Sequence, residues 1–105
     1  MTPKVRWATG AYLTLGELWF CLAKGHAEPS KDYSHIAFNI QAIEFQEFAT
    51  QLLKKGVEVW QKNVSEGQSL YIFDPDGHKL EIHAGTLETR MQQLRVKAYP
   101  DLIWF

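Results

Sequence analysis

The fold is decided by the stretch Ala42-Ile-Glu-Phe-Gln-Glu-Phe-Ala-Thr-Gln-Leu-Leu-Lys-Lys-Gly56. Apolar residues recur there at every third or fourth position, which is the spacing of an amphipathic helix. These residues are Ala42, Phe45, Phe48, Ala49 and Leu52. Glycine at position 56 is a typical helix stop. The stretch therefore predicts a helix over Ala42–Lys55 with one apolar face.

Strand patterns flank this helix on both sides. They cover Tyr33–Ile40 before it and Val57–Gln61, Ser69–Phe73 and Lys79–His83 after it. The turn sequence Asp74-Pro-Asp-Gly77 is expected to close a hairpin between the last two strands. We predict that one strand, the helix and three strands make a curled antiparallel sheet with the helix on one side. The other face of such a sheet is concave and open.

Further elements extend this unit at both ends. Tyr12–Leu22 predicts two short strands around Gly16, the second of them buried, with Cys21 in the core. Thr86 can cap a last helix that runs through Arg95. We therefore predict one α+β domain over 1–105. In it, 6–23 supply only the trailing strands of a first module, 33–84 form a complete module and 86–96 form a C-terminal helix.

Composition narrows the classes of function. The chain has 105 residues, enough for one domain, and its 11 basic and 12 acidic residues leave a net charge of -1. That balance favours neither nucleic acid nor an anionic membrane as a partner, so small molecules and proteins remain. One cysteine excludes an internal disulfide, and the sequence shows no signal segment or long apolar run. We expect a cytoplasmic protein.

Two residues suggest metal chemistry. Strand alternation places His35 on one face with Tyr33, and Glu81 on one face with His83. An imidazole nitrogen and a carboxylate oxygen on the concave face can converge on a divalent metal. The alternative is a hydrogen-bonded histidine and a surface glutamate.

The segment between the second and third strands of the complete module suggests a cation loop. It supplies hydroxyls, a carboxylate and backbone carbonyls from Asn63, Ser65, Glu66, Gly67 and Ser69. Such oxygen ligands suit a hard cation, although a solvated connection has the same composition. Arg90 can reach an anionic group at the sheet edge or lie on the helix surface. Trp7, Trp19, Trp60 and Tyr71 are candidates either for the core or for a pocket wall.

Five motifs together resemble the glutathione-dependent fosfomycin-resistance transferases of the vicinal oxygen chelate superfamily, relatives of glyoxalase I and extradiol dioxygenases. The motifs are Arg6-Trp-Ala-Thr-Gly-Ala-Tyr12, Gly16-Glu-Leu-Trp-Phe-Cys-Leu22, Asp32-Tyr-Ser-His-Ile-Ala-Phe38, Ser65-Glu-Gly-Gln-Ser69 and Asp74-Pro-Asp-Gly-His-Lys-Leu-Glu-Ile-His83. The resemblance implies a glyoxalase-like domain with one complete βαβββ module and the trailing strands of another. It also implies a homodimer that pairs modules across chains.

The resemblance further implies an enzyme that opens the epoxide of fosfomycin with the glutathione thiolate. His35 and Glu81 match two of three ligands of a catalytic Mn²⁺ ion, which acts as a Lewis acid on the epoxide oxygen. The loop matches a K⁺ site. The residues that match phosphonate-holding positions are Ser65, Ser69, Tyr71 and Arg90, with Tyr71 and Arg90 taken as catalytic. Trp19 is expected to line the pocket, and Trp7 and Tyr33 are expected near the thiol substrate.

Three departures qualify these expectations. The family begins with a strand and a helix of about thirty residues, carrying the third metal-binding histidine, that we expect this chain to lack. A family lysine aligns with Gln61 while Lys62 follows, and strand alternation turns the charge to the opposite face. Val64 stands where an arginine is expected. Two other functions therefore stay open: a module that binds a small molecule without turnover, and a folding-impaired remnant.

Overall fold

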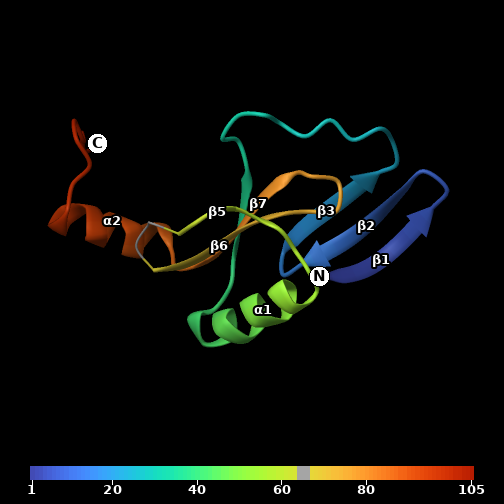
Figure 1. The fold of residues 1–105 in the computed structure, drawn as a ribbon, viewed down its shortest axis with the longest axis horizontal. Coiled ribbons are helices and arrows are strands. Elements are labelled where there is room, and N and C mark those ends of the chain that lie inside the picture. Colours follow the sequence, from blue (N-terminus) through green and yellow to red (C-terminus); the bar gives the residue numbers. More distant parts are fainter. Residues whose placement is uncertain (64–66) are drawn as a thin grey trace.

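Each helix of the chain follows a run of strands. The computed structural model describes residues 1–63 and 67–105, and within them it contains two small sheets and two helices (Figure 1). The elements are β1 (Thr2–Trp7), β2 (Gly10–Leu15), β3 (Leu18–Ala23), β4 (Ile36–Asn39), α1 (Ala42–Lys54), β5 (Val59–Gln61), β6 (Gln68–Phe73), β7 (Lys79–Ala84) and α2 (Leu87–Val96). One sheet has the order β1-β2-β3, and the other has the order β4-β7-β6-β5.

The sheet of β4, β5, β6 and β7 is mixed, so the prediction of an antiparallel sheet is wrong for one pair of strands. β4 pairs with β7 in parallel, with Ala37 opposite Glu81, whereas β5, β6 and β7 pair antiparallel. The parallel pair arises because α1 carries the chain across to β5 in the direction of β4. Two further reversals then restore that direction in β7.

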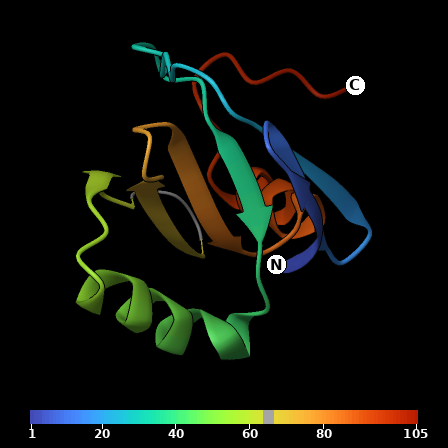
Figure 2. The ribbon, with the colours of Figure 1, turned by 90° about the vertical axis from the view of Figure 1, so that its right-hand side faces the viewer.

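The predicted central helix is confirmed as α1, which ends at Lys54, one residue earlier than expected. Gly56 follows with a φ of 83°, a left-handed conformation that suits glycine at a helix end. Phe45 and Ala49 are buried and pack with Ala84 of β7. The helix thus covers one face of the sheet, as Figure 2 shows, and leaves the other face for the site.

The sheet of β1, β2 and β3 carries a row of aromatic rings. Tyr12 packs edge-on between Trp7 and Trp19, with ring centroids 4.9 and 5.0 Å apart. The hairpin of β2 and β3 agrees with the prediction, but β1 was not predicted. Its residues show no strand alternation. They form a strand because they pair with β2, across an irregularity between Pro3 and Val5 where proline lacks a donor.

β3 is not the buried strand that its apolar run predicts. Its residues are exposed except for Phe20, and Cys21 is an exposed free thiol, so its predicted core position is wrong. The reason is that β3 lies at an edge of its small sheet, whereas α1 packs on β6 and β7 of the other sheet. Phe20 approaches Phe38 of β4, with ring centroids 6.0 Å apart.

The fold is elongated, with extents of 50 × 29 × 28 Å and a radius of gyration of 16.1 Å. A compact domain of this length has a radius of about 13 Å. No side chain in the described residues is less than 2% exposed, so the hydrophobic core is thin. Large apolar side chains of both sheets remain at the surface.

α2 begins with the predicted cap at Thr86. The Thr86 hydroxyl accepts a hydrogen bond from the backbone N–H of Thr89 at 3.1 Å, and the Thr89 hydroxyl completes a capping box. Within the described parts of the chain, no helix has the length and apolar character needed to cross a membrane.

Candidate active site

The site centres on His35 and Glu81, which the structure brings together. His35 Nε2 lies 3.0 Å from Glu81 Oε1, although the residues are 46 positions apart in sequence. Glu81 is in the middle of β7, opposite Ala37 on one side and Tyr71 on the other. His35 immediately precedes β4, which begins at Ile36 and is shorter than predicted.

The contacts of His35 define what each of its ring nitrogens does. Its Nδ1 lies 2.8 Å from the carbonyl oxygen of Tyr33, which can only accept, so Nδ1 carries the proton. The Nε2 lone pair of the neutral ring then faces a carboxylate oxygen. Two electron-pair donors at this distance are satisfied by a shared proton or by a cation, and a backbone-bonded histidine is the usual form of a metal ligand.

The second oxygen of Glu81 is held separately. Ser69 is buried, and its hydroxyl donates to Glu81 Oε2 at 3.0 Å and contacts His83 Nδ1 at 2.5 Å. Nδ1 of His83 also lies 3.5 Å from Oε2. These contacts fix the carboxylate so that Oε1 faces His35. The Ser69 hydroxyl, predicted to contact both a cation and the substrate, is here engaged with Glu81.

An aromatic wall surrounds the His35 ring. The ring centroids of Tyr33, Trp60 and Tyr71 lie 5.0, 5.3 and 6.1 Å from that of His35. Tyr71 is 5% exposed. The sequence names Trp60 only as a candidate for the core or for a pocket wall, and the structure places it in this wall. The wall shields one side of His35 from water.

Gln61 also faces the site. Its side-chain amide donates to the Tyr33 hydroxyl at 3.1 Å, and its backbone lies opposite Tyr71. A bulge in β5 interrupts the alternation between Val59 and Gln61, so two neighbouring residues, Trp60 and Gln61, contact the same group of rings. Simple alternation therefore does not predict which face of the sheet each residue of β5 lies on. Lys62 is exposed.

The predicted cation loop is described only at its ends. The Asn63 amide donates to the carbonyl of Gly67 at 2.9 Å, which ties the two ends together. Gly67 has a φ of 70°, and a Cβ there would lie 3.1 Å from the carbonyl oxygen of Ala84, so glycine is required by both conformation and space. Val64, Ser65 and Glu66 lie outside the described residues.

Arg90 of α2 is half-buried and lines a hollow of about 540 Å³ together with Asn39, Glu81 and His83. An arginine beside this carboxylate edge of the sheet can hold an anionic group. Trp7 and Trp19 lie instead on the other sheet, where both contact Tyr12 and Trp19 is 64% exposed. The structure therefore groups Tyr33, Tyr71 and Arg90, but neither of these tryptophans, around the central pair.

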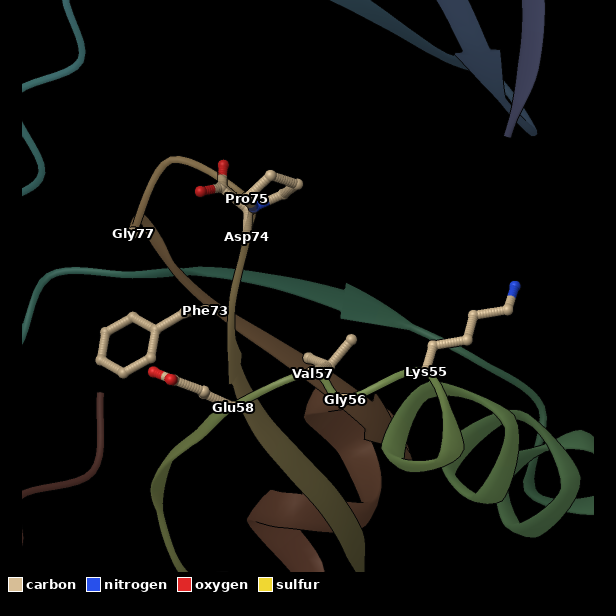
Figure 3. A pocket seen from close by; sticks show the side chains of 8 residues that line it. All are labelled: Lys55, Gly56, Val57, Glu58, Phe73, Asp74, Pro75 and Gly77. Carbon is tan, nitrogen blue, oxygen red and sulfur yellow. The ribbon is translucent and has the colours of Figure 1, made fainter.

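A second pocket lies apart from this site. It has a volume of about 520 Å³ and lies between the end of α1 and the turn that joins β6 to β7 (Figure 3). Asp74 on its rim accepts hydrogen bonds from the backbone N–H groups of Asp76 and His78, which shape the turn. Figure 3 shows Lys55 extending away from Asp74. The Asp74 carboxylate is thus used in the turn itself.

The loop before His35 is anchored to the sheet. Asp32 Oδ1 accepts from the Ser30 hydroxyl at 2.5 Å and from the Ser34 N–H at 2.8 Å, which together lower the pKa of Asp32 to about 2. The Lys79 ammonium donates to the carbonyls of Ser30 and Asp32 at 2.8 Å each. These bonds hold the chain where it enters the site.

Two side chains of the site are suitable ligands for one divalent cation. The structure offers one imidazole nitrogen and one carboxylate oxygen pointing at each other, which are ligand types of Mn²⁺ and Zn²⁺. Within residues 1–63 and 67–105, no group of three or more His, Cys, Asp or Glu side chains is placed to hold a metal ion. The described residues thus bring together two candidate ligands, His35 and Glu81.

Comparisons with known proteins place the chain in a family. No protein-family model matches it. It is 43% identical over 109 residues to glutathione transferase FosA of Serratia marcescens, covering 99% of this chain and 77% of that protein. It is 38% identical over 91 residues to metallothiol transferase FosB of Staphylococcus epidermidis (strain ATCC 12228 / FDA PCI 1200), covering 80% of this chain and 64% of that protein.

A solved structure shows the same likeness. The fosfomycin resistance protein FosX of Listeria monocytogenes, complexed with Mn(II) and sulfate, aligns with a TM-score of 0.76 and 34% identity, over 88% of this chain and 76% of that one. The chain thus spans about three quarters of FosA and FosX and less than two thirds of the staphylococcal FosB. With its glyoxalase-like α+β fold, the chain belongs to the family of fosfomycin-resistance transferases.

Proposed function

We propose that this chain opens the epoxide ring of fosfomycin with a thiol, glutathione in the first instance, at the His35–Glu81 site. The observation that carries the proposal is the approach of His35 Nε2 to Glu81 Oε1 at 3.0 Å on the face opposite α1. The thiolate sulfur bonds to one epoxide carbon while the carbon–oxygen bond breaks, and the oxygen takes up a proton.

His35 and Glu81 would hold a divalent metal, and the Mn(II) in the FosX structure supports this choice of ion. A bound divalent cation supplies Lewis-acid polarisation of the epoxide oxygen. The chain's own residues prepare the two ligands. The Tyr33 carbonyl fixes the tautomer of His35, and Ser69 and His83 fix the second oxygen of Glu81.

The remaining residues bind and orient the substrates. Arg90, at the rim of the hollow beside Glu81, would clamp the phosphonate through charge-assisted hydrogen bonds. Tyr71 and Tyr33 would exclude water from the reacting atoms, with Tyr33 on the thiol side. We also propose that the segment from Asn63 to Ser69 binds K⁺ near the phosphonate, through oxygen ligands that include Ser65 and Glu66.

A homodimer belongs to the same proposal. The radius of gyration of 16.1 Å, the thin core and the exposed rings of Trp7 and Trp19 leave apolar surface for a second copy to cover. Such pairing would bring Trp7 and Trp19 toward a site in the dimer. The names of FosA and FosB support glutathione or another thiol as the co-substrate.

The test is fosfomycin-dependent consumption of glutathione by the purified chain with Mn²⁺ and K⁺ present. Glu81→Gln should abolish both consumption and Mn²⁺ binding, because it removes the charged ligand. Glu88→Gln is the matched control, since Glu88 is 62% exposed on α2 and pairs only loosely with Arg95 at 3.7 Å. Turnover that persists in Glu81→Gln would reject the proposed site.

A second candidate function is a module that binds a small molecule without turnover. The observation in its favour is the two-ligand set of the described residues, which leaves a metal held by fewer protein groups than a catalytic zinc site provides. Under this alternative, fosfomycin raises the melting temperature equally with and without a chelator. A stabilisation that requires the metal would exclude it.

A further inference from the structure

We infer that Trp60 is a positioning residue of the active site, which holds the His35 imidazole in the orientation that faces Glu81. The consequence of this inference for catalysis rests on the proposed function. The contact between Trp60 and His35 does not depend on that function. Trp60 is neither a metal ligand nor a member of the phosphonate-binding set. It reaches the site from β5, next to the bulge that also brings Gln61 there.

The register of β5 places Trp60 on the site face. Val59 lies opposite Ile72 and Gln61 lies opposite Tyr71, so Trp60 and Gln61 of β5 together oppose one residue of β6. Bulges occur beside active sites, where they redirect a side chain. Val59 lies on the face of Ile72 and Leu70, which packs with the core under α1, so the next residue, Trp60, falls on the opposite face with Tyr71 and Glu81. The bulge keeps Gln61 on that face as well.

The indole is anchored at one end. Its Nε1–H donates to the carbonyl oxygen of Leu80 at 3.1 Å. Since β6 lies between β5 and β7, the indole crosses β6 and bonds to β7 at the residue before Glu81. The position of the indole is therefore tied to the backbone that carries the metal-binding carboxylate.

The Trp60 ring also contacts the ring of His35 directly. Trp60 contacts the rings of His35 at 5.3 Å, Tyr71 at 5.2 Å and Tyr33 at 5.7 Å, all with their planes steeply inclined. His35 itself precedes β4 and lacks the support of the strand ladder. The Tyr33 carbonyl and Glu81 Oε1 contact the two nitrogens of the imidazole. The indole packs against the ring itself and limits its rotation about the side-chain bonds, and packing of this kind fixes the geometry of a functional group.

The experiment compares two variants at position 60. Trp60→Leu keeps apolar bulk and removes the ring, whereas Trp60→Phe keeps a ring and removes the N–H donor to Leu80. The matched controls are Trp104→Leu and Trp104→Phe, because Trp104 is 48% exposed near the C-terminus and contacts Arg95. The readouts are the Mn²⁺ dissociation constant and, without metal, the NMR resonances of the His35 ring protons.

We expect Trp60→Leu to weaken Mn²⁺ binding about 10-fold and Trp60→Phe to weaken it about 3-fold, in line with partners outside the ligand shell. The His35 ring protons should lose the ring-current shift of the indole in Trp60→Leu, while both Trp104 variants match the wild type. Wild-type Mn²⁺ affinity and unchanged His35 resonances in Trp60→Leu would overturn the inference.

If Trp60→Leu does not fold, Trp60→Phe decides: unchanged Mn²⁺ affinity overturns the inference and a loss supports it. Failure of the proposed function has a different signature. A wild type that neither binds Mn²⁺ nor consumes glutathione rejects that function, while the metal-free His35 resonances of the Trp60 variants still decide the positioning role.

Discussion

Removal of the Ser69 hydroxyl should destabilise the protein by about 2 kcal/mol. The hydroxyl is buried, donates to Glu81 Oε2 at 3.0 Å and contacts His83 Nδ1 at 2.5 Å. A hydrogen bond to a charged group contributes about 1.5–3 kcal/mol and a neutral one about 1 kcal/mol. Because Glu81 keeps its contacts with His35 and His83 in Ser69→Ala, we take a value somewhat below the sum of these two contributions, about 2 kcal/mol.

The assay is urea unfolding and thermal melting at one fixed protein concentration, since association changes apparent stability. A loss of about 2 kcal/mol corresponds to a fall in Tm of about 8–16 °C for a chain of this size. Thr50→Ala is the control, because it removes an exposed hydroxyl from α1 and should change stability by less than about 0.5 kcal/mol. A Ser69→Ala protein as stable as that control would refute the view that this hydroxyl holds the carboxylate.

Two further perturbations test other parts of the fold. The pKa of Asp32 is lowered to about 2, chiefly by the Ser30 hydroxyl, so the unfolded chain binds the proton first as pH falls from about 4. Wild type should therefore lose stability between about pH 4 and pH 2, and Asp32→Asn should lose less over that window in urea midpoints. The same dependence of the urea midpoint on pH in wild type and Asp32→Asn would contradict this expectation. At position 10, a Cβ would lie 2.6 Å from Trp7 Cζ2, so Gly10→Ala should cost about 1–3 kcal/mol and weaken the near-ultraviolet circular dichroism of the aromatic row. Gly25 has open space around it, so Gly25→Ala should leave the stability unchanged. Equal stability of the Gly10→Ala and Gly25→Ala variants would show that there is no clash at position 10.

The sequence predicts those parts of the fold that depend on local periodicity. The apolar spacing of Ala42–Lys55 gives α1 to within one residue, because a long amphipathic pattern has one compatible structure. Thr86 is found at the predicted cap of α2. Alternation in β7 also places Glu81 and His83 on one face, where the structure finds them beside Ser69.

Local sequence patterns do not predict the features that depend on how strands pair. β1 exists because it pairs with β2, and Cys21 is exposed because β3 is an edge strand of its sheet. The single extra residue in β5 decides that Trp60 and Gln61 both contact the aromatic wall, and no composition signal marks it. An aromatic residue followed by a polar one at the end of a very short strand is the only hint, and it is a weak one.

The parallel pairing of β4 with β7 has a consequence for how any cation would bind. His35 and Glu81 are 46 positions apart, so an unfolded chain must close a long loop before one ion can contact both. The loss of chain entropy for a loop of this length is about 4 kcal/mol. Strand pairing has already closed the loop in the native state, and an arriving ion meets both donors without that loss. A variant that weakens the pairing of β4 with β7 should therefore also lower the metal affinity. Metal affinity thus measures whether the two ends of the module are paired.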